Sequence, residues 1–428
     1  MPYQSPISPG YSWYEATVGD RPAYPRLDGD LSVDVVIVGG GFTGLSAAAH
    51  LAKAGTRVAL IEQYRFGDGA SGRNGGQLGT GQRAGVEEME KEFGFERSKA
   101  LFDLAEEAKS HLLEFSRVNG IDIDFRAGHL NVSHRKRDVP EYREHAEVMQ
   151  TRYNYSHIHF MDAAECAERV GSTAYFGGVR DTGAGHIHPL KLVVGTARVA
   201  SEAGAQLFEQ TAATDVSSNG GKVTVKTATG TITAEKCLLA VDAHVGKLEK
   251  KTAAHIMPIG SFIGATVPLG ADSTVLPGGE SVSDSRFVVR YFRRAPTGEL
   301  LFGGREIYGV NDPKDIPIHI RRQIAETYPA LGEVEITHAW GGYVGITMPR
   351  TIWVREVMPN VTSAGGYSGH GVMLSNFVGK LYAETVTGNR DRLKLFKEYK
   401  VPAFPGGRKF RAPLLFLALN WYALRDRL

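Results

Sequence analysis

Residues 33–62 read VDVVIVGGGFTGLSAAAHLAKAGTRVALIE, and the fold is predicted from this stretch. The apolar run at 33–38 is typical of a strand that is buried on both faces of a parallel sheet. Small and apolar residues at helical spacing follow over 45–55 and predict a helix that ends at a glycine. Residues 57–61 predict a second strand, so the stretch forms a βαβ unit.

Three glycines, Gly39, Gly41 and Gly44, join the first strand to the helix at the spacing G-x-G-x-x-G. The first permits a tight turn, the second lets a pyrophosphate approach the backbone, and the third lets helix and strand pack closely. The N–H groups and the dipole at the helix N-terminus attract phosphates. Glu62 at the end of the second strand suits ribose hydroxyls and repels a 2′-phosphate, so FAD or NAD is predicted and NADP is not.

The bulk composition narrows the class of protein. A chain of 428 residues predicts two domains or one large interrupted domain, and 49 Lys and Arg against 47 Asp and Glu give no electrostatic case for nucleic acid. Cys166 and Cys237 lie far apart in the sequence, so neither a disulfide framework nor a metal site is predicted.

No targeting or membrane-spanning segment is predicted. Residues 1–32 are polar, rich in Pro and Tyr, and lack the pattern of a signal peptide, so we expect an extended leader over the surface of a cytoplasmic protein. The uncharged run 252–271 has the length of a span, but Pro258 and Pro268 favour strands in a folded domain.

Two further glycine-rich segments predict contacts with a flat ligand. The loop 67–85 contains ASGRNGGQ at 70–77, where many glycines permit positive φ angles and Arg73, Asn74 and Gln77 supply polar groups. Near the end of the chain, a predicted strand at 361–364 leads into GGYSGHG at 365–371 and then a helix. A helix N-terminus aimed at a flavin stabilises negative charge in the reduced ring.

The order of predicted elements gives a discontinuous domain organisation. Helices are predicted at 96–118 and 189–203, and a β meander at 222–241 ends near Ala240, at the edge of the sheet where ligands bind. Residues 33–118, 179–255 and 341–400 are assigned to the dinucleotide domain. Residues 119–178 and 256–340 are assigned to a substrate domain, and residues 401–428 to a basic and apolar tail.

These motifs together resemble the glycine/D-amino-acid oxidase superfamily of FAD enzymes, and within it the γ-glutamylputrescine oxidoreductase branch. The resemblance rests on VVIVGGGFTGLSAAAHLA, ASGRNGGQ and GGYSGHGV and covers nearly the whole chain. It implies an α/β plus α+β fold, with an interrupted Rossmann-like FAD domain and a substrate domain on a mainly antiparallel sheet. It also implies oxidation of an amine to an imine, which water hydrolyses to an aldehyde and ammonia.

The motifs assign the cofactor contacts and the mode of binding. The predicted contacts are Gly39, Gly41, Phe42, Thr43, Gly44, Glu62, Gln63, Ser71, Gly72, Arg73, Asn74, Gly75, Gly76, Gln77, Leu78, Val216, Ala240, Gly366, Tyr367, Ser368, Gly369, His370 and Gly371. Sarcosine-oxidase-like relatives attach the flavin to a Cys in the segment that matches 341–349. That segment has no Cys here, so FAD is predicted to bind non-covalently. The Lys that those relatives use with O2 is missing at 300–302, which leaves the electron acceptor open.

The residues that contact the substrate are predicted from the chemistry of amines. A free amine has a pKa of about 10, and hydride leaves only the neutral form, so an apolar pocket is expected. Trp340 and Tyr343 are the predicted pocket walls, with ordinary core aromatics as the alternative, and His370 is either a proton acceptor or a positional residue. Arg290, Arg293 and Arg305 are candidates to bind a substrate carboxylate, with solvated strand-edge arginines as the alternative.

Three functions are compatible with the sequence. The first is an FAD amine oxidase, acting on γ-glutamylputrescine or a similar γ-glutamyl-diamine, that passes electrons to O2 and gives H2O2. The second is an FAD amine or D-amino-acid dehydrogenase that uses a quinone or another acceptor and contacts a membrane through 408–428. That tail resembles an interfacial helix, and docking on the protein's own body is the alternative. The third is a non-catalytic nucleotide-binding protein.

Overall fold

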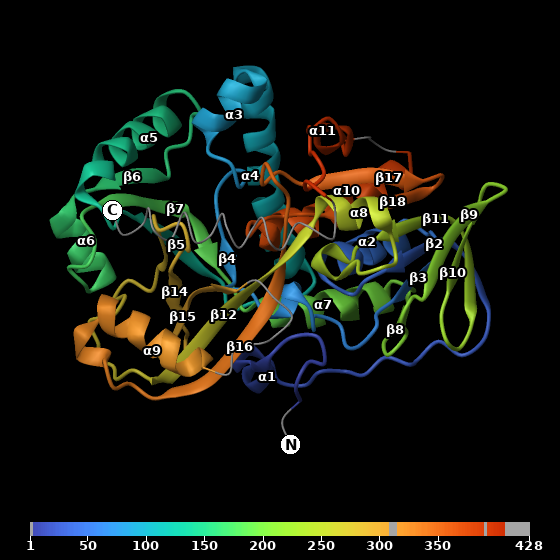
Figure 1. Ribbon diagram of the computed structural model, residues 1–428, viewed down its shortest axis with the longest axis horizontal. Coiled ribbons are helices and arrows are strands. Elements are labelled where there is room, and N and C mark those ends of the chain that lie inside the picture. The colour runs from blue at the N-terminus through green and yellow to red at the C-terminus, as the bar shows by residue number, and fades with distance from the viewer. Residues whose placement is uncertain (1–2, 308–314, 389–391, 407–428) are drawn as a thin grey trace.

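Two β-sheets stand side by side in the computed structural model, which describes residues 3–307, 315–388 and 392–406 (Figure 1). The smaller sheet has eight strands, in the order β17-β18-β11-β2-β3-β8, and β10 and β9 continue from β11 as a hairpin. The strands are β2 (Leu31–Val38), β3 (Val58–Ile61), β8 (Gln206–Phe208), β9 (Asp215–Asn219), β10 (Lys222–Lys226), β11 (Thr231–Leu239), β17 (Trp353–Met358) and β18 (Val361–Gly365).

The central strands of the smaller sheet are parallel, and three of them are apolar toward their carboxyl ends, at 35–38, 58–61 and 237–239. β2 pairs in parallel with β3 and β11, and β11 pairs in parallel with β18, so their carboxyl ends lie at one edge. Residues 35–38 and 58–61 are buried on both faces, as the apolar runs predicted. This edge is where ligands of open parallel sheets bind.

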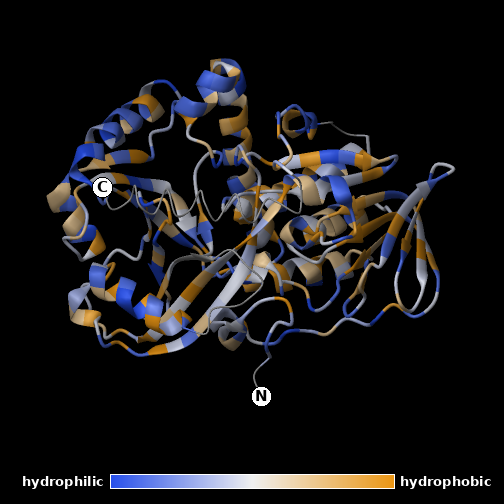
Figure 2. Cartoon of the chain, viewed as in Figure 1, coloured by the Kyte–Doolittle hydropathy of each residue, from blue (hydrophilic) through white to orange (hydrophobic). Residues whose placement is uncertain are grey.

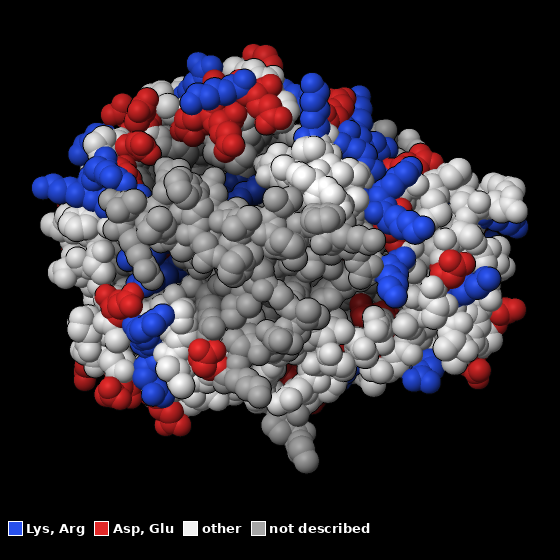
Figure 3. Space-filling view, in the orientation of Figure 1, with Lys and Arg blue, Asp and Glu red and all other residues white. Residues whose placement is uncertain are grey.

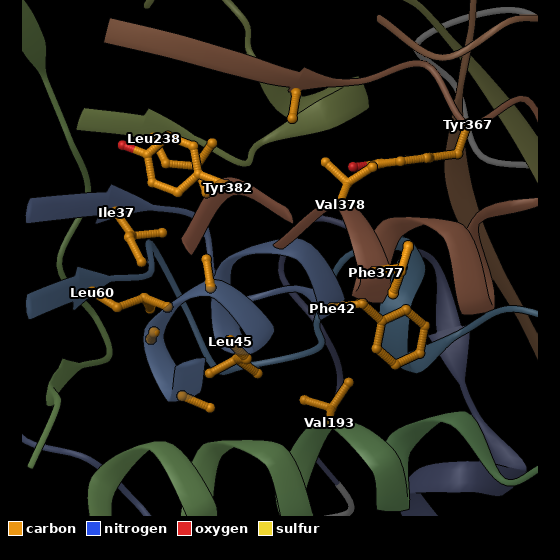
Figure 4. Close-up of a cluster of buried hydrophobic side chains, with 14 of the residues drawn as sticks. Ile37, Phe42, Leu45, Leu60, Val193, Leu238, Tyr367, Phe377, Val378 and Tyr382 are labelled. Carbon is orange, nitrogen blue, oxygen red and sulfur yellow. The ribbon is translucent and has the colours of Figure 1, made fainter. Parts of the chain in front are cut away.

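Helices cover the smaller sheet, and the helix of the predicted βαβ unit lies at the centre of the core. They are α2 (Phe42–Lys53), α4 (Phe95–Val118), α7 (Pro189–Glu202) and α10 (Gly371–Val386). Figure 4 shows Leu45 of α2 between Val193 of α7 and Val378 of α10. The backbones of α2 and α10 approach so closely that a β-carbon at Gly379 would lie 2.3 Å from the Thr43 carbonyl oxygen.

The larger sheet has ten strands and is mainly antiparallel, which confirms the predicted fold class. Its strands are β1 (Gly10–Tyr11), β4 (Gln77–Leu78), β5 (Arg126–Val132), β6 (Ile158–Met161), β7 (Gly178–His186), β12 (Met257–Pro268), β13 (Ser281–Asp284), β14 (Tyr291–Arg294), β15 (Glu299–Ile307) and β16 (Ile336–Ile346). Helix α9 (Ile316–Thr327) packs over one face, above the stacked rings of Phe292 and Phe302. The other face turns toward the smaller sheet.

Short helices complete the described chain. They are α1 (Trp13–Thr17), α3 (Val86–Phe93), α5 (Val139–Thr151), α6 (Ala163–Val170), α8 (Lys250–His255) and α11 (Lys394–Lys397). Apolar residues gather inside and polar residues outside along these elements (Figure 2). Basic and acidic side chains are interspersed over the described part of the surface in Figure 3.

The sheets divide the chain differently from the predicted boundaries. The boundaries at residues 179 and 341 fall inside β7 and β16, and both strands belong to the larger sheet. β4 also joins that sheet, through its pairing with β7, although it was assigned to the dinucleotide domain. Sequence patterns mark where strands lie, but the pairing of strands far apart in the chain decides which sheet they join.

Part of the N-terminal segment packs into the core, which corrects the prediction that residues 1–32 form an extended leader over the surface. β1 pairs with β16, and Tyr14 of α1 is fully buried against Trp340, with ring centroids 5.4 Å apart. Ser12 begins α1 by accepting a hydrogen bond from the Glu15 backbone at 3.1 Å.

Membrane contact through the tail is not addressed by the structure. Residues 408–428, for which peripheral contact was predicted, lie outside the described residues. In the part of the chain that is described, every helix is either too short or too polar to cross a bilayer.

Candidate active site

A cavity of about 420 Å³ lies at the carboxyl edge of the parallel strands. Its size is in the range of small-molecule and cofactor sites, roughly 300–1,000 Å³. Many of the predicted cofactor contacts line it: Gly39, Gly41, Phe42, Thr43, Glu62, Gln63, Ser71, Asn74, Ala240, Tyr367, Gly369 and Gly371. The remaining predicted contacts are not among the residues that line it: Gly44, Gly72, Arg73, Gly75, Gly76, Gln77, Leu78, Val216, Gly366, Ser368 and His370.

The first glycine turn forms one wall of the cavity. Gly39 has a φ of +112°, and a β-carbon there would lie 2.5 Å from the Ala240 carbonyl oxygen. A β-carbon at Gly44 would lie 1.9 Å from the Gly39 carbonyl oxygen, so Gly44 serves the packing of α2 on β2. Helix α2 begins after Gly41, which has no side chain to cap it, and Gly41, Phe42 and Thr43 at the helix start line the cavity.

Glu62 is held in place at the end of β3. One carboxylate oxygen accepts the Gly40 N–H at 2.8 Å, and the other accepts the Tyr64 N–H at 3.1 Å. Burial raises the pKa of Glu62 above its ordinary value. The carboxylate lines the cavity with a fixed orientation, as the predicted contact with a ribose requires.

The loop after β3 contributes Ser71 and Asn74 to the cavity. The Ser71 hydroxyl accepts the Phe42 N–H at 3.0 Å and so ties the loop to the start of α2. The Asn74 amide donates to the Ala70 and Ser71 carbonyls, both at 3.0 Å, and its oxygen accepts the Gly76 N–H at 2.8 Å. Both residues therefore shape the loop as well as the cavity wall.

Arg73 does not face the cavity, which corrects the predicted phosphate contact. Its guanidinium donates to the carbonyls of Gly341 at 2.5 Å, Pro9 at 2.6 Å and Gly10 at 2.9 Å. Burial lowers the pKa of Arg73 to about 10. This side chain joins the loop to the N-terminal segment and to β16, two segments that sequence spacing could not connect to it.

The second glycine turn is fixed by Asp242, a residue that the sequence analysis missed. Asp242 has a φ of +42°, and its carboxylate accepts the N–H groups of Gly366 at 2.6 Å and Gly345 at 3.1 Å. Enclosure by the surrounding protein raises the pKa of Asp242 above its ordinary value. The available signal was its position, just beyond the end of β11.

The two glycine turns meet at a single hydrogen bond. The hydroxyls of Tyr367 and Thr43 lie 2.7 Å apart, and both residues line the cavity. His370 caps α10 and turns away from the lining toward Gly79, where a β-carbon would lie 3.0 Å from the His370 Nε2. Desolvation, together with the charge of Arg83, lowers the pKa of His370 to about 3, so this imidazole is neutral near pH 7.

The cavity is also lined by residues that were not predicted as cofactor contacts. These are Thr211, Ala213, Thr214, Val241, His244, Val245, Gly246, Lys247, Leu248, Val344, Gly345, Val372 and Ser375. Val216, which was predicted to contact the cofactor, is buried in the β9–β10 hairpin, and Ala213 and Thr214 line the cavity in its place. Lys247 brings a cation to the lining, which suits an anionic ligand.

The lining has the chemistry that FAD requires. The N-terminus of α2 and Lys247 suit a pyrophosphate, and the oriented Glu62 carboxylate suits a ribose diol. A β-carbon at Gly369 would have no atom within 4 Å, so this glycine leaves the backbone open to a bulky ligand, whereas β-carbons at Gly39 and Gly41 would meet Ala240 and Ser71. These residues would hold the dinucleotide, and the second turn with α10 would meet its ring.

Trp340 and Tyr343 do not form one pocket wall. They are three residues apart on β16, so their side chains point to opposite faces of the sheet. Trp340 is fully buried and donates its indole N–H to the Arg73 carbonyl at 3.0 Å, as a core aromatic does. Tyr343 is half-buried beside His244, with ring centroids 5.9 Å apart, at the margin of the cavity.

The predicted arginine cluster is divided by the sheet. Arg290 is ion-paired with Glu326 of α9, on the face turned away from the cavity. Arg293 is buried, and its guanidinium donates to the carbonyls of Gly75 at 2.9 Å and Ile187 at 3.1 Å. Both are structural residues in this fold, which corrects their assignment to a substrate carboxylate. The side chain of Arg305 lies outside the described residues.

Comparison with known proteins agrees with this geometry. The family described as "DAO: FAD dependent oxidoreductase" matches residues 34–385. A probable oxidoreductase OrdL from Rhizobium meliloti (strain 1021) is 58% identical over 427 residues, which cover 100% of both chains. The γ-glutamylputrescine oxidoreductase of Escherichia coli (strain K12) is 34% identical over 420 residues, 97% of this chain and 98% of that protein.

Solved structures share the fold. Glycine oxidase from Geobacillus kaustophilus superposes with a TM-score of 0.72 at 22% identity, covering 84% of this chain and 96% of that one. The match covers 84% of the chain, more than either sheet with its helices contains, so the similarity extends over both sheets. With the family match over most of the chain and a cavity fitted to a dinucleotide, the chain belongs to the DAO family of FAD-dependent oxidoreductases.

Proposed function

We propose that this enzyme oxidises the CH–NH bond of an amine, with γ-glutamylputrescine or a similar γ-glutamyl-diamine as substrate. The product imine would be hydrolysed to an aldehyde and ammonia. The observation that carries the proposal is the 34% identity to a γ-glutamylputrescine oxidoreductase over almost the full length of both chains. The cavity supports it, because its glycine turns, Glu62 and Lys247 suit FAD.

The chain's own task is to favour the neutral amine. FAD, when bound, supplies the ring that accepts two electrons. An alkyl ammonium with a pKa of about 10 has no free lone pair, so its neutral form must be selected by desolvation. The imidazole of His370 is neutral near pH 7 and lies beside the second turn, so it places no like charge near the ammonium, and desolvation is left to select the neutral amine.

We further propose that FAD is bound without a covalent bond. Cys166 and Cys237 are both buried, and neither is among the described residues that line the cavity. Burial also raises the pKa of the Cys166 thiol to about 11, which disfavours the reactive thiolate. Acid precipitation is expected to release all yellow colour into the supernatant. Colour that stays with the pellet would contradict this mode of binding.

We propose that O2 accepts the electrons. The alternative is a quinone or another acceptor. Leu300, Leu301 and Phe302 of β15 are fully buried apolar residues, and no Lys stands among them. Turnover with amine should therefore be compared for H2O2 yield and for reduction of an artificial dye. A stoichiometric peroxide yield supports an oxidase, and dye reduction without peroxide supports a dehydrogenase.

The decisive experiment is anaerobic reduction of the flavin. The purified protein is mixed with γ-glutamylputrescine, a D-amino acid or sarcosine, and the flavin band at about 450 nm is followed. Rapid bleaching by γ-glutamylputrescine is expected, with slow or absent bleaching by the amino acids. Bleaching by a D-amino acid alone would overturn the proposed substrate class, and a colourless protein that does not take up FAD would overturn the cofactor.

A further inference from the structure

A row of uncharged polar side chains crosses the inner face of the larger sheet. Asn131 of β5 is level with Ser283 of β13, and Ser283 is level with Tyr291 of β14. Residues paired in this way carry side chains on the same face. Ser261 of β12 joins them, because its hydroxyl lies 2.9 Å from that of Tyr291. With Gln77 of β4, these residues are called the polar row here.

The polar row faces the loop that lines the cofactor cavity. The Tyr291 ring lies over Gly75, where a β-carbon would be 3.0 Å from two ring atoms. Gln77, two residues further along the loop, donates to the Val282 carbonyl at 2.9 Å and accepts from the Ser283 hydroxyl at 3.2 Å. The row therefore lies across the glycine loop from the parallel sheet.

The side chains of the polar row are partly exposed, whereas neighbouring side chains of the same sheet are buried. All five side chains are half-buried, although four of them stand on strands in the middle of the sheet; Gln77 stands on β4 at its edge. The neighbouring Ser281 is fully buried, as are Phe292 and Phe302 on the opposite face. The row therefore presents partly exposed polar side chains on the face of the sheet that meets the glycine loop.

The row carries no charge of its own, and Asp181, Arg293 and Arg290 nearby are engaged with the protein. Arg126 of β5 is level with His186, as Gln77 is, and it is exposed on the same face. Asp181 accepts from the Tyr155 hydroxyl at 2.8 Å and from the Gly183 N–H at 2.9 Å. Arg293 donates to backbone carbonyls, and Arg290 lies on the other face. Desolvation lowers the pKa of His129 to about 4, so the imidazole beside Asn131 is neutral near pH 7.

We infer that the polar row recognises an uncharged carboxamide in the tail of the amine substrate. Hydroxyl and amide groups hydrogen-bond to both the N–H and the C=O of an amide, whereas a bare ammonium would lie there without a counter-charge. This inference rests on the proposed function, since it presumes that the substrate is an amine. It distinguishes amide-bearing amines from free diamines of the same length.

The inference is tested by comparing three amines that differ in one feature each. γ-Glutamylputrescine has the amide and a charged head, N-acetylputrescine has the amide alone, and putrescine has neither. The rate of anaerobic flavin bleaching is expected to be within about tenfold for the first two and at least 100-fold lower for putrescine, since an unmatched polar site discriminates strongly. Equal rates for N-acetylputrescine and putrescine would overturn the inference.

Variants of the row separate recognition from folding. Ser283→Ala and Tyr291→Phe each remove one hydroxyl, and each is expected to lower the ratio of kcat/KM for N-acetylputrescine over putrescine about tenfold. The matched control is Ser218→Ala in the β9–β10 hairpin, where the hydroxyl bonds to the Pro359 carbonyl at 2.6 Å and the ratio should not move. Ratios that stay constant in both row variants would contradict amide recognition.

Failure of this inference is distinguishable from failure of the proposed function. If no amine bleaches the flavin, the proposed function fails. If amines bleach the flavin but the amide makes no difference, only the polar row's role fails. The FAD content of each variant, from its absorbance at about 450 nm, shows whether a lost rate comes from lost cofactor.

Discussion

The cofactor cavity and the polar row are built in opposite ways. One wall of the cavity comes from a single run of 30 residues, in which strand, glycine turn, helix and acid follow one another. The polar row instead gathers side chains from β4, β5, β12, β13 and β14, which only the register of the sheet places together. Local geometry therefore determines where the dinucleotide is held, and long-range pairing determines what lies opposite it.

The largest effect is expected from a change in the continuous run of residues that builds one wall of the cofactor cavity. Gly44→Val places a side chain where even a β-carbon would lie 1.9 Å from the Gly39 carbonyl oxygen, so α2 cannot pack on β2. We expect a protein without bound FAD and with a free energy of unfolding lower by about 4 kcal/mol or more. Absorbance at 450 nm and urea unfolding measure both quantities.

The matched control for Gly44 lies in the same βαβ unit. A β-carbon at Gly55 has no atom within 4 Å, and only its φ of +81° disfavours a side chain. Gly55→Ala should cost about 1 kcal/mol and leave the FAD content unchanged. An equal loss of FAD in both variants would show that the close contact at Gly44 is not the reason.

The next largest effect is expected at Arg73, which joins the glycine loop to the N-terminal segment and to β16. Arg73→Met removes the donor to the carbonyls of Pro9, Gly10 and Gly341, which leaves buried acceptors unpaired. We expect the free energy of unfolding to fall by about 3 kcal/mol, measured in urea. Arg57→Met is the control, because its ion pair with Asp34 is exposed, so its loss should leave the free energy of unfolding nearly unchanged.

Acidification should lower the stability of the packing between α2 and α4, two helices that cover the smaller sheet. Burial lowers the pKa of His50 to about 3 and of His111 to about 4, and their Nε2 atoms lie 3.2 Å apart. Because the folded pKa values lie below the unfolded value of about 6.5, this stability is complete above that pH and is lost as the pH falls toward 4 and 3.

The acid effect is measured by urea unfolding at pH 7 and pH 5.5. The free energy of unfolding should fall by about 2.5 kcal/mol through these two groups together, and the double variant His50→Gln/His111→Gln should lose most of this dependence. His159→Gln, at an exposed position of β6, serves as the control and should leave it in place. An unchanged pH dependence in the double variant would assign it to other groups.

The smallest effect is expected at Trp340, which tests its place in the core. Trp340→Phe removes the indole N–H that donates to the Arg73 carbonyl at 3.0 Å. Stability should fall by about 1–2 kcal/mol, while kcat/KM for the amine changes less than about threefold. A loss of kcat/KM without loss of stability would instead support the earlier assignment of Trp340 as a pocket wall.

Much of the fold and of the cofactor side was predictable because the signals are local. The spacing of Gly39, Gly41 and Gly44 and the apolar period around them report backbone conformations that depend on neighbours in the chain. The same holds for the start of α10 after the second glycine turn. Asp242 escaped prediction because its role comes from two N–H groups more than 100 residues away.

By itself, the sequence determined that a buried parallel strand runs into a glycine turn and a helix N-terminus with an acid beyond it, hence a dinucleotide site. Only the tertiary structure decided that Arg73 and Arg293 bind backbone carbonyls, that Trp340 is core, and that uncharged side chains face the glycine loop. The reason is physical: a side chain's partner depends on which strands pair and on their register, and a shift of one residue reverses the face that each side chain occupies.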